Sequence, residues 1–103
     1  MIVRQKKMIA IEVSCNGAKV VLAGSEALEG GMIGASVDVP DTCEDKVLLT
    51  VFGVTKYVEG EQQRVLYWKE RMPFSVGDEI RIRAIPSSVA DPHESESDPL
   101  TEE

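Results

Sequence analysis

Residues 65–85 read VLYWKERMPFSVGDEIRIRAI and contain the only tryptophan of the chain, a turn signal and the most regular alternation. The last six residues alternate between two sets, with Ile80, Ile82 and Ala84 at one parity and Arg81, Arg83 and Ile85 at the other. Because a strand repeats every two residues, one face of this segment is apolar and the other carries two guanidinium groups. The pattern predicts a half-buried strand that closes at Pro86.

The residues before this strand predict a turn and a second strand. Residues 75–79 read SVGDE and supply glycine and aspartate where the backbone must reverse. Residues 61–72 fit two structures, since a helix would place Val65, Trp68 and Met72 on one face. We favour a strand, because residues 65–68 are all branched or aromatic and Pro73 would truncate a helix early.

The remaining chain shows the same strand-like code. Asn16-Gly17 is typical of a type I′ turn, and it separates an alternating segment at 8–15 from an apolar one at 19–23. The second of these is apolar on both faces, which predicts a place inside the sheet or under a cover. Residues 24–31 read as a loop, with one helical turn over 25–29 as an alternative.

Two further strands complete the prediction. Residues 33–39 alternate up to Pro40, and residues 46–57 are apolar at both parities, so we expect the latter to be the most buried strand. About six strands with turns every 8 to 12 residues indicate an all-β domain, either an antiparallel sandwich or a small barrel. The strand order is not fixed by these patterns.

The net charge of −7 is unevenly distributed. Residues 87–103 hold six acids and no lysine or arginine, so the first 86 residues hold 11 cations and 12 anions and have a net charge of −1. This C-terminal segment is rich in serine and proline and poor in apolar residues, which predicts disorder. We therefore divide the chain into a β-domain at 1–86 and an acidic tail at 87–103.

The sequence predicts a cytoplasmic location. The basic start of the chain is followed by an apolar run that Glu12 interrupts, which does not fit a secretory signal. No apolar stretch approaches the roughly 20 residues that span a bilayer. Cys15 and Cys43 are expected to be free thiols in such a compartment.

A few motifs together resemble a group of short bacterial β-domain proteins. They are Asn16-Gly17, Ala23-Gly24, the lone Trp68 and residues 76–80, VGDEI, ahead of an acidic tail with prolines. The resemblance implies a bacterial, intracellular β-domain. It implies no activity and no site residues.

No set of residues predicts catalysis, a metal or a cofactor. His93 lies in the segment expected to be disordered, and Cys15 shares the apolar face of its strand. Cys43 lies in an acidic loop, where neighbouring anions disfavour a thiolate. The two cysteines are 28 positions apart and no second pair completes four ligands, so we predict that the chain is not an enzyme and holds no metal.

Two binding functions remain. The first is a protein-interaction or regulatory module that binds another protein or a second copy of itself. In a narrower version, the module neutralises a toxin or regulates a partner, and its acids meet a basic target. The alternative is an oligonucleotide-binding barrel, in which cations on one strand face and neighbouring rings hold a nucleic acid. The near-neutral body argues against nucleic acid, and ion pairs of the arginines with Glu70 or Glu79 explain the pattern without a ligand. The candidate binding residues are Tyr67, Trp68, Arg81 and Arg83.

Overall fold

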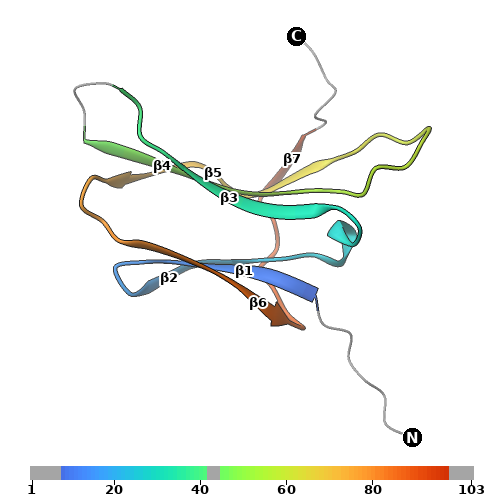
Figure 1. Ribbon diagram of the computed structural model, residues 1–103, viewed down its shortest axis with the longest axis horizontal. Coiled ribbons are helices and arrows are strands. Elements are labelled where there is room, and N and C mark those ends of the chain that lie inside the picture. The colour runs from blue at the N-terminus through green and yellow to red at the C-terminus, as the bar shows by residue number, and fades with distance from the viewer. Residues whose placement is uncertain (1–7, 42–44, 98–103) are drawn as a thin grey trace, which may run out of the picture.

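The computed structural model describes residues 8–41 and 45–97, which form two antiparallel sheets stacked in two layers (Figure 1). The all-β prediction is confirmed. The two sheets are separate and face each other, which is the sandwich form of the predicted architectures. The helical part within the described residues is a single short 3₁₀ turn, η1 (Glu26–Leu28), which is the alternative predicted for residues 25–29.

Three strands form one layer and four form the other. The first sheet has the order β2-β1-β6 and the second has the order β3-β4-β5-β7. The strands of the first are β1 (Met8–Cys15), β2 (Ala18–Ala23) and β6 (Ile80–Ser87). The strands of the second are β3 (Met32–Asp38), β4 (Lys46–Val54), β5 (Val65–Ser75) and β7 (Ser95–Ser97).

The two predicted turns, at Asn16-Gly17 and at residues 75–79, are joined to each other by hydrogen bonds. Asn16 and Gly17 have φ of 52° and 85°, as the first hairpin requires. The Asn16 side chain donates to Asp78 Oδ1 at 3.0 Å and accepts from the Glu79 backbone N–H at 2.9 Å. The turn between β1 and β2 therefore holds the turn through which the chain passes from β5 in one sheet to β6 in the other.

Residues 65–75 are a strand, as predicted, but an irregular one. Glu70 and Arg71 both lie opposite Thr50 of β4, and Arg71 has φ of 52°, so the ladder contains a β-bulge there. A second irregularity, next to Trp68, allows Leu66, Trp68 and Met72 all to face the inner side of the sheet. Pro73 is tolerated inside the strand because β7 pairs with β5 only up to Tyr67, leaving that part of β5 at the edge of the sheet.

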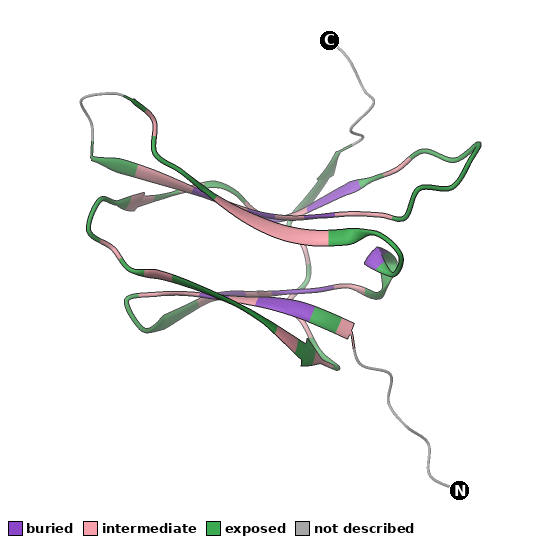
Figure 2. Cartoon of the chain, in the orientation of Figure 1, coloured by how far each residue is buried: buried purple, intermediate pink, exposed green. Residues whose placement is uncertain are grey.

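The core lies between the sheets, and its largest fully buried side chain is Trp68, at 1 % exposure (Figure 2). Burial of each such apolar side chain stabilises the fold by about 1.5–3 kcal/mol. β4 alternates buried and half-buried residues, and η1 packs Leu28 onto Gly53, where an added Cβ would lie 2.4 Å from Leu28 Cδ1. The other large, fully buried side chains are Val13, Leu49, Val51 and Leu66.

The prediction of disorder from residue 87 onward is wrong for residues 87–97. This segment completes β6, crosses between the sheets and adds β7 to β5. It lacks apolar side chains for a core of its own, but its backbone and carboxylates bind groups that the two sheets offer. The amino-acid composition indicates the lack of apolar side chains, but it does not reveal the bonds to the two sheets. Residues 98–103 lie outside the described residues.

The position predicted for residues 19–23 is corrected in one respect. β2 is an edge strand and not an inner one. The alternative, a cover, is present: Ala23 forms an isolated parallel bridge with Asp91, and Gly24 lies close to Ala90.

Candidate functional site

The structure does not bring the four predicted binding residues together. Trp68 is a core residue, and its indole N–H donates to the Asp91 backbone carbonyl at 2.7 Å. Tyr67 is the next residue along β5 and faces the opposite side of that sheet. Arg81 and Arg83 lie on the other sheet, β2-β1-β6. A stacking platform that combines these rings with these cations is therefore absent.

The arginines of β6 lie on the outer face of their sheet. Arg83 Nε donates to Glu12 Oε1 at 3.0 Å, and these two residues are directly opposite each other in the β1–β6 ladder. The predicted cross-strand ion pair therefore exists, but its acid is Glu12 and not Glu70 or Glu79. A shallow depression of about 290 Å³ on this face mixes three cations with two acids, and its lining consists of Glu12, Ser14, Gly17, Lys19, Glu79, Arg81 and Arg83.

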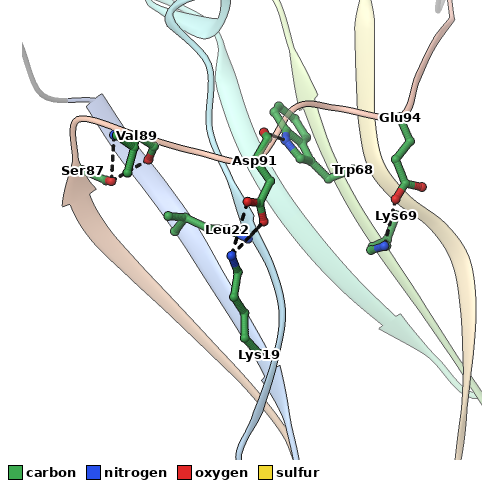
Figure 3. Close-up of polar contacts among 8 residues, drawn as sticks. All are labelled: Lys19, Leu22, Trp68, Lys69, Ser87, Val89, Asp91 and Glu94. Atoms are coloured by element: carbon green, nitrogen blue, oxygen red, sulfur yellow. Dashed lines mark hydrogen bonds and ion pairs between the residues drawn. The ribbon is translucent and has the colours of Figure 1, made fainter.

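One lateral side of the sandwich is closed by residues 88–94, here called the strap (Figure 3). Asp91 carries most of the attachment. Its backbone N–H donates to the Leu22 carbonyl at 2.8 Å, and its carboxylate accepts from the Leu22 N–H at 2.8 Å. The carboxylate also pairs with Lys19 at 3.2 Å. Because the Asp91 carbonyl accepts from Trp68 of β5, this one residue joins β2 to the opposite sheet.

The two acids that follow Asp91 along the described chain, Glu94 of the strap and Glu96 of β7, also have partners. Glu94 pairs with Lys69 at 2.8 Å, and its backbone N–H donates to the Tyr67 carbonyl at 2.7 Å. Glu96 pairs with Arg64 at 3.2 Å, and Glu96 Oε2 lies 2.9 Å from His93 Nε2. The acids at 91, 94 and 96 are therefore paired with cations of β2, of β5 and of the residue just before β5.

Hydrogen bonding to the ionised carboxylates is the main electrostatic effect at the strap. The backbone N–H of Leu22 holds the pKa of Asp91 below its ordinary value, and Lys19 adds to this against the opposing effect of burial. The His93 ring, followed by the charge of Arg64, lowers the pKa of Glu96. Both carboxylates are thus stabilised in the charged form that binds the sheets.

The opposite lateral side is open, and we call it the open seam, defined by Ile9, Val37 and Ile82. The edge strands here are β3 and β6, which lie nearest the viewer in Figure 1. Val37 is directly opposite Leu49, and Ile82 is directly opposite Val13, two fully buried core residues. Directly opposite residues of a ladder point to the same face. Val37 and Ile82 therefore point between the sheets.

The seam residues nevertheless remain in solvent. Val37 and Ile82 are both 43 % exposed, and Ile9, which shares the inward parity of Ile11 and Val13, is 61 % exposed. Inward-facing side chains are exposed only where nothing fills the space between the sheets. The seam thus combines apolar surface with two strand edges that no other described strand covers.

A cavity of about 550 Å³ lies at one end of the open seam, near η1. Its apolar lining comes from the start of β1, from Leu28 and from the start of β3, with Met32 52 % exposed. Glu26 and Glu29 lie at its margin. A concave apolar surface of this size can accept one or two side chains of a bound polypeptide.

The two edges at the seam differ in chemistry. β6 carries Arg81 and Arg83 and contains Pro86, features with which natural proteins block edge-to-edge pairing. β3 reads MIGASVD, with no lysine, arginine or proline and one acid at its end. Of the two edges, β3 is the one suited to accept another strand.

The described residues contain no group of three or more histidine, cysteine or acidic side chains placed to hold a metal ion. Burial, followed by the charge of Asp78, raises the pKa of the Cys15 thiol, so this cysteine is poorly suited to act as a nucleophile. His93 packs edge-on against Trp68 with ring centroids 5.9 Å apart. Cys43 lies outside the described residues.

Comparisons with protein-family models, with curated proteins and with solved structures find no match to this chain. In residues 8–41 and 45–97, no helix has the length and apolar character needed to cross a membrane.

Sequence reasoning missed both Asp91 and the seam residues. A signal existed for β3, since its segment has alternating apolar residues without any edge-blocking charge. It becomes informative only once β3 is known to be an edge strand.

Proposed function

We propose that this protein is a non-catalytic interaction module that binds an extended polypeptide strand along the outer edge of β3, with side chains entering the open seam. The observation that carries the proposal is the exposure of Val37 and Ile82, which face the interior between two uncovered edges. A strand added to β3 would pair with its free backbone groups and direct every second side chain into the seam.

The ion pairs of the acidic segment favour protein binding at the seam over binding through the acids themselves. Asp91, Glu94 and Glu96 each pair with a cation of this chain, so these acids are already engaged. A binding mode in which they meet a basic target, as in the toxin-neutralising version, would have to break these pairs. A polypeptide that binds at the seam meets apolar surface and breaks none of these ion pairs.

The geometry gives less support to nucleic-acid binding. The cations on the β2-β1-β6 face are interspersed with Glu12 and Glu79, and no aromatic side chain lines their depression. Sequence-tolerant binding of single strands combines a cationic groove with stacking rings. Tyr67 and Trp68 belong to the other sheet.

The proposal is tested by NMR titration of the ¹⁵N-labelled protein with seven-residue peptides in which valine or isoleucine alternates with serine or threonine. We expect concentration-dependent shifts of β3 amides and of residues facing the seam, with little change at the strap. Peptides with the same composition and no alternation are the control. Absence of β3 shifts at about 1 mM peptide, where even weak complexes are populated, would overturn the proposal.

A further inference from the structure

We infer that the strand that occupies the β3 edge is β3 of a second copy of this chain, paired antiparallel about Ala35. This inference rests on the proposed function, because it names the partner for the same edge. It is carried by the self-complementarity of β3 and by the contrast with β6.

β3 can pair with a second β3 in a symmetric register. Ala35 is the midpoint of Met32–Asp38, so a two-fold axis through it pairs all seven residues. Same-parity residues then meet across the new ladder. The resulting pairs are Ala35 with Ala35, Ile33 with Val37, Gly34 with Ser36, and Met32 with Asp38.

The side chains that meet in this register are compatible with each other. Ile33, Ala35 and Val37 point to the inner face, since they lie opposite Gly53, Val51 and Leu49 of β4, which are buried. On that face every cross-copy pair is apolar. On the outer face Gly34 meets Ser36 with no steric conflict, and the single acid, Asp38, meets Met32. Like charges directly opposite each other would be destabilising, and no pair in this register contains them.

The other edge at the seam, β6, is poorly suited to pair with itself. Self-pairing registers that use most of β6 and are centred on residue 82 or 83 place arginine opposite arginine. Registers centred further along bring Pro86, which has no N–H, into the ladder. Such pairs are unfavourable, so β6 lacks the self-complementarity of β3.

The same pairing also brings the open seams of the two copies together. A two-fold axis through the β3 edge, perpendicular to the sheet, leaves the β2-β1-β6 sheets of both copies on the same side of the joined β3-β4-β5-β7 sheets. The inner faces of the two copies then form one continuous interior. Exposed apolar groups such as Val37 and Ile82 gain cover in this arrangement, which gives the association a hydrophobic driving force.

The first experiment is sedimentation analysis of the full chain over a dilution series up to about 100 µM, a range that detects associations of micromolar affinity. We expect a monomer–dimer equilibrium in the unmodified protein. Val37→Lys, which places a charge in the new interior, is expected to weaken association at least tenfold. Val76→Lys, the same change at an exposed site in the β5–β6 turn, is the matched control and should leave association unchanged.

The second experiment tests the register by disulfide trapping. Cys15 and Cys43 are first changed to serine, and cysteine is then introduced as Ala35→Cys or as Ser36→Cys. Ala35 lies opposite itself in the proposed pairing, whereas Ser36 lies opposite Gly34, so Ala35→Cys should form several-fold more covalent dimer. Circular dichroism confirms that each variant keeps the strand signal.

The outcomes separate the inference from the proposed function. A strictly monomeric chain, Val37→Lys as dimeric as the unmodified protein, or trapping that does not favour Ala35→Cys would each overturn the inference. If peptides still shift β3 amides in a monomeric chain, the edge binds other polypeptides and the proposed function stands. If neither a dimer nor peptide binding is found, both are wrong.

Discussion

Trp68 joins the core to the strap through a single hydrogen bond. Its ring fills the centre of the sandwich, and its N–H reaches the Asp91 carbonyl at 2.7 Å. A buried indole N–H usually finds a partner, because leaving it unpaired costs free energy. The sequence suggests this residue as a binding residue, whereas the structure places it in the core.

We expect Trp68→Phe to lower the free energy of unfolding by about 1–2 kcal/mol, since phenylalanine keeps much of the ring packing but cannot donate to Asp91. Urea unfolding followed by circular dichroism measures the change. Tyr67→Phe is the control, because no hydrogen bond of the Tyr67 hydroxyl is found in the described chain, and its effect should stay within about 0.5 kcal/mol. Equal effects of the two changes would contradict this role.

Asn16 combines a left-handed backbone with a bridge between two turns. We expect Asn16→Gly to lower the free energy of unfolding through loss of the two side-chain hydrogen bonds. Asn16→Ala should lower it by about 1 kcal/mol more, because alanine also resists a φ of 52°. Thermal or urea unfolding gives both values, and an alanine variant as stable as the glycine variant would show that the backbone relaxes at this turn.

Asp91 makes stability depend on pH in a direction that follows from its lowered pKa. Because the pKa in the folded state lies below the unfolded value, Asp91 contributes stability above the unfolded pKa, and this contribution is lost as pH falls through the folded pKa. Unfolding free energies measured between about pH 6 and pH 2 should therefore fall less steeply for Asp91→Asn than for the unmodified protein. Asp41→Asn, at an exposed site with no side-chain hydrogen bond in the described chain, should leave the slope unchanged.

The strap shows why an element can be invisible in sequence yet ordered in the fold. Residues 88–94 have no alternation and only two apolar residues, Val89 and Ala90, and their order comes from bonds to Leu22, Tyr67 and Trp68. Strands such as β1, β3 and β6 are readable because their own residues alternate. The partners of the strap lie more than 20 residues away, so no local pattern records them.

Truncation after residue 87 should therefore destabilise the fold and expose Trp68. We expect its fluorescence emission to shift to longer wavelength and the unfolding midpoint in urea to fall. Glu94→Ala is the matched control, since it removes one exposed ion pair, worth about 0–1 kcal/mol, and keeps the strap. Unchanged emission after truncation would show that the strap does not cover the tryptophan.

The whole molecule is asymmetric, with one lateral side closed by the strap and the other left open. Because of this asymmetry, two residues that lie directly opposite each other in one ladder differ in solvent exposure. Val13 of β1 is fully buried, whereas Ile82, directly opposite it on β6, is 43 % exposed. Sequence assigns both to the same apolar face and cannot distinguish them.

In dilute solution, where the chain is monomeric, Val13→Ala should lower the free energy of unfolding by about 2 kcal/mol, through lost transfer energy and a cavity. Ile82→Ala should cost less than about 1 kcal/mol although it removes a larger group, since Ile82 is already 43 % exposed to water in the folded chain. Urea unfolding compares the two. A larger loss at Ile82 would mean that the seam is closed in solution.

The amino-acid sequence by itself determined the all-β class, the Asn16-Gly17 hairpin, the alternation of β6 and the turn that precedes it. These depend on contacts between near neighbours and on the two-residue period of a strand. The tertiary structure decided which strands are edges, which side of the sandwich the strap closes and which inward-facing residues stay exposed. Those properties depend on which sheet each strand joins, and a period of two residues carries no information about that choice.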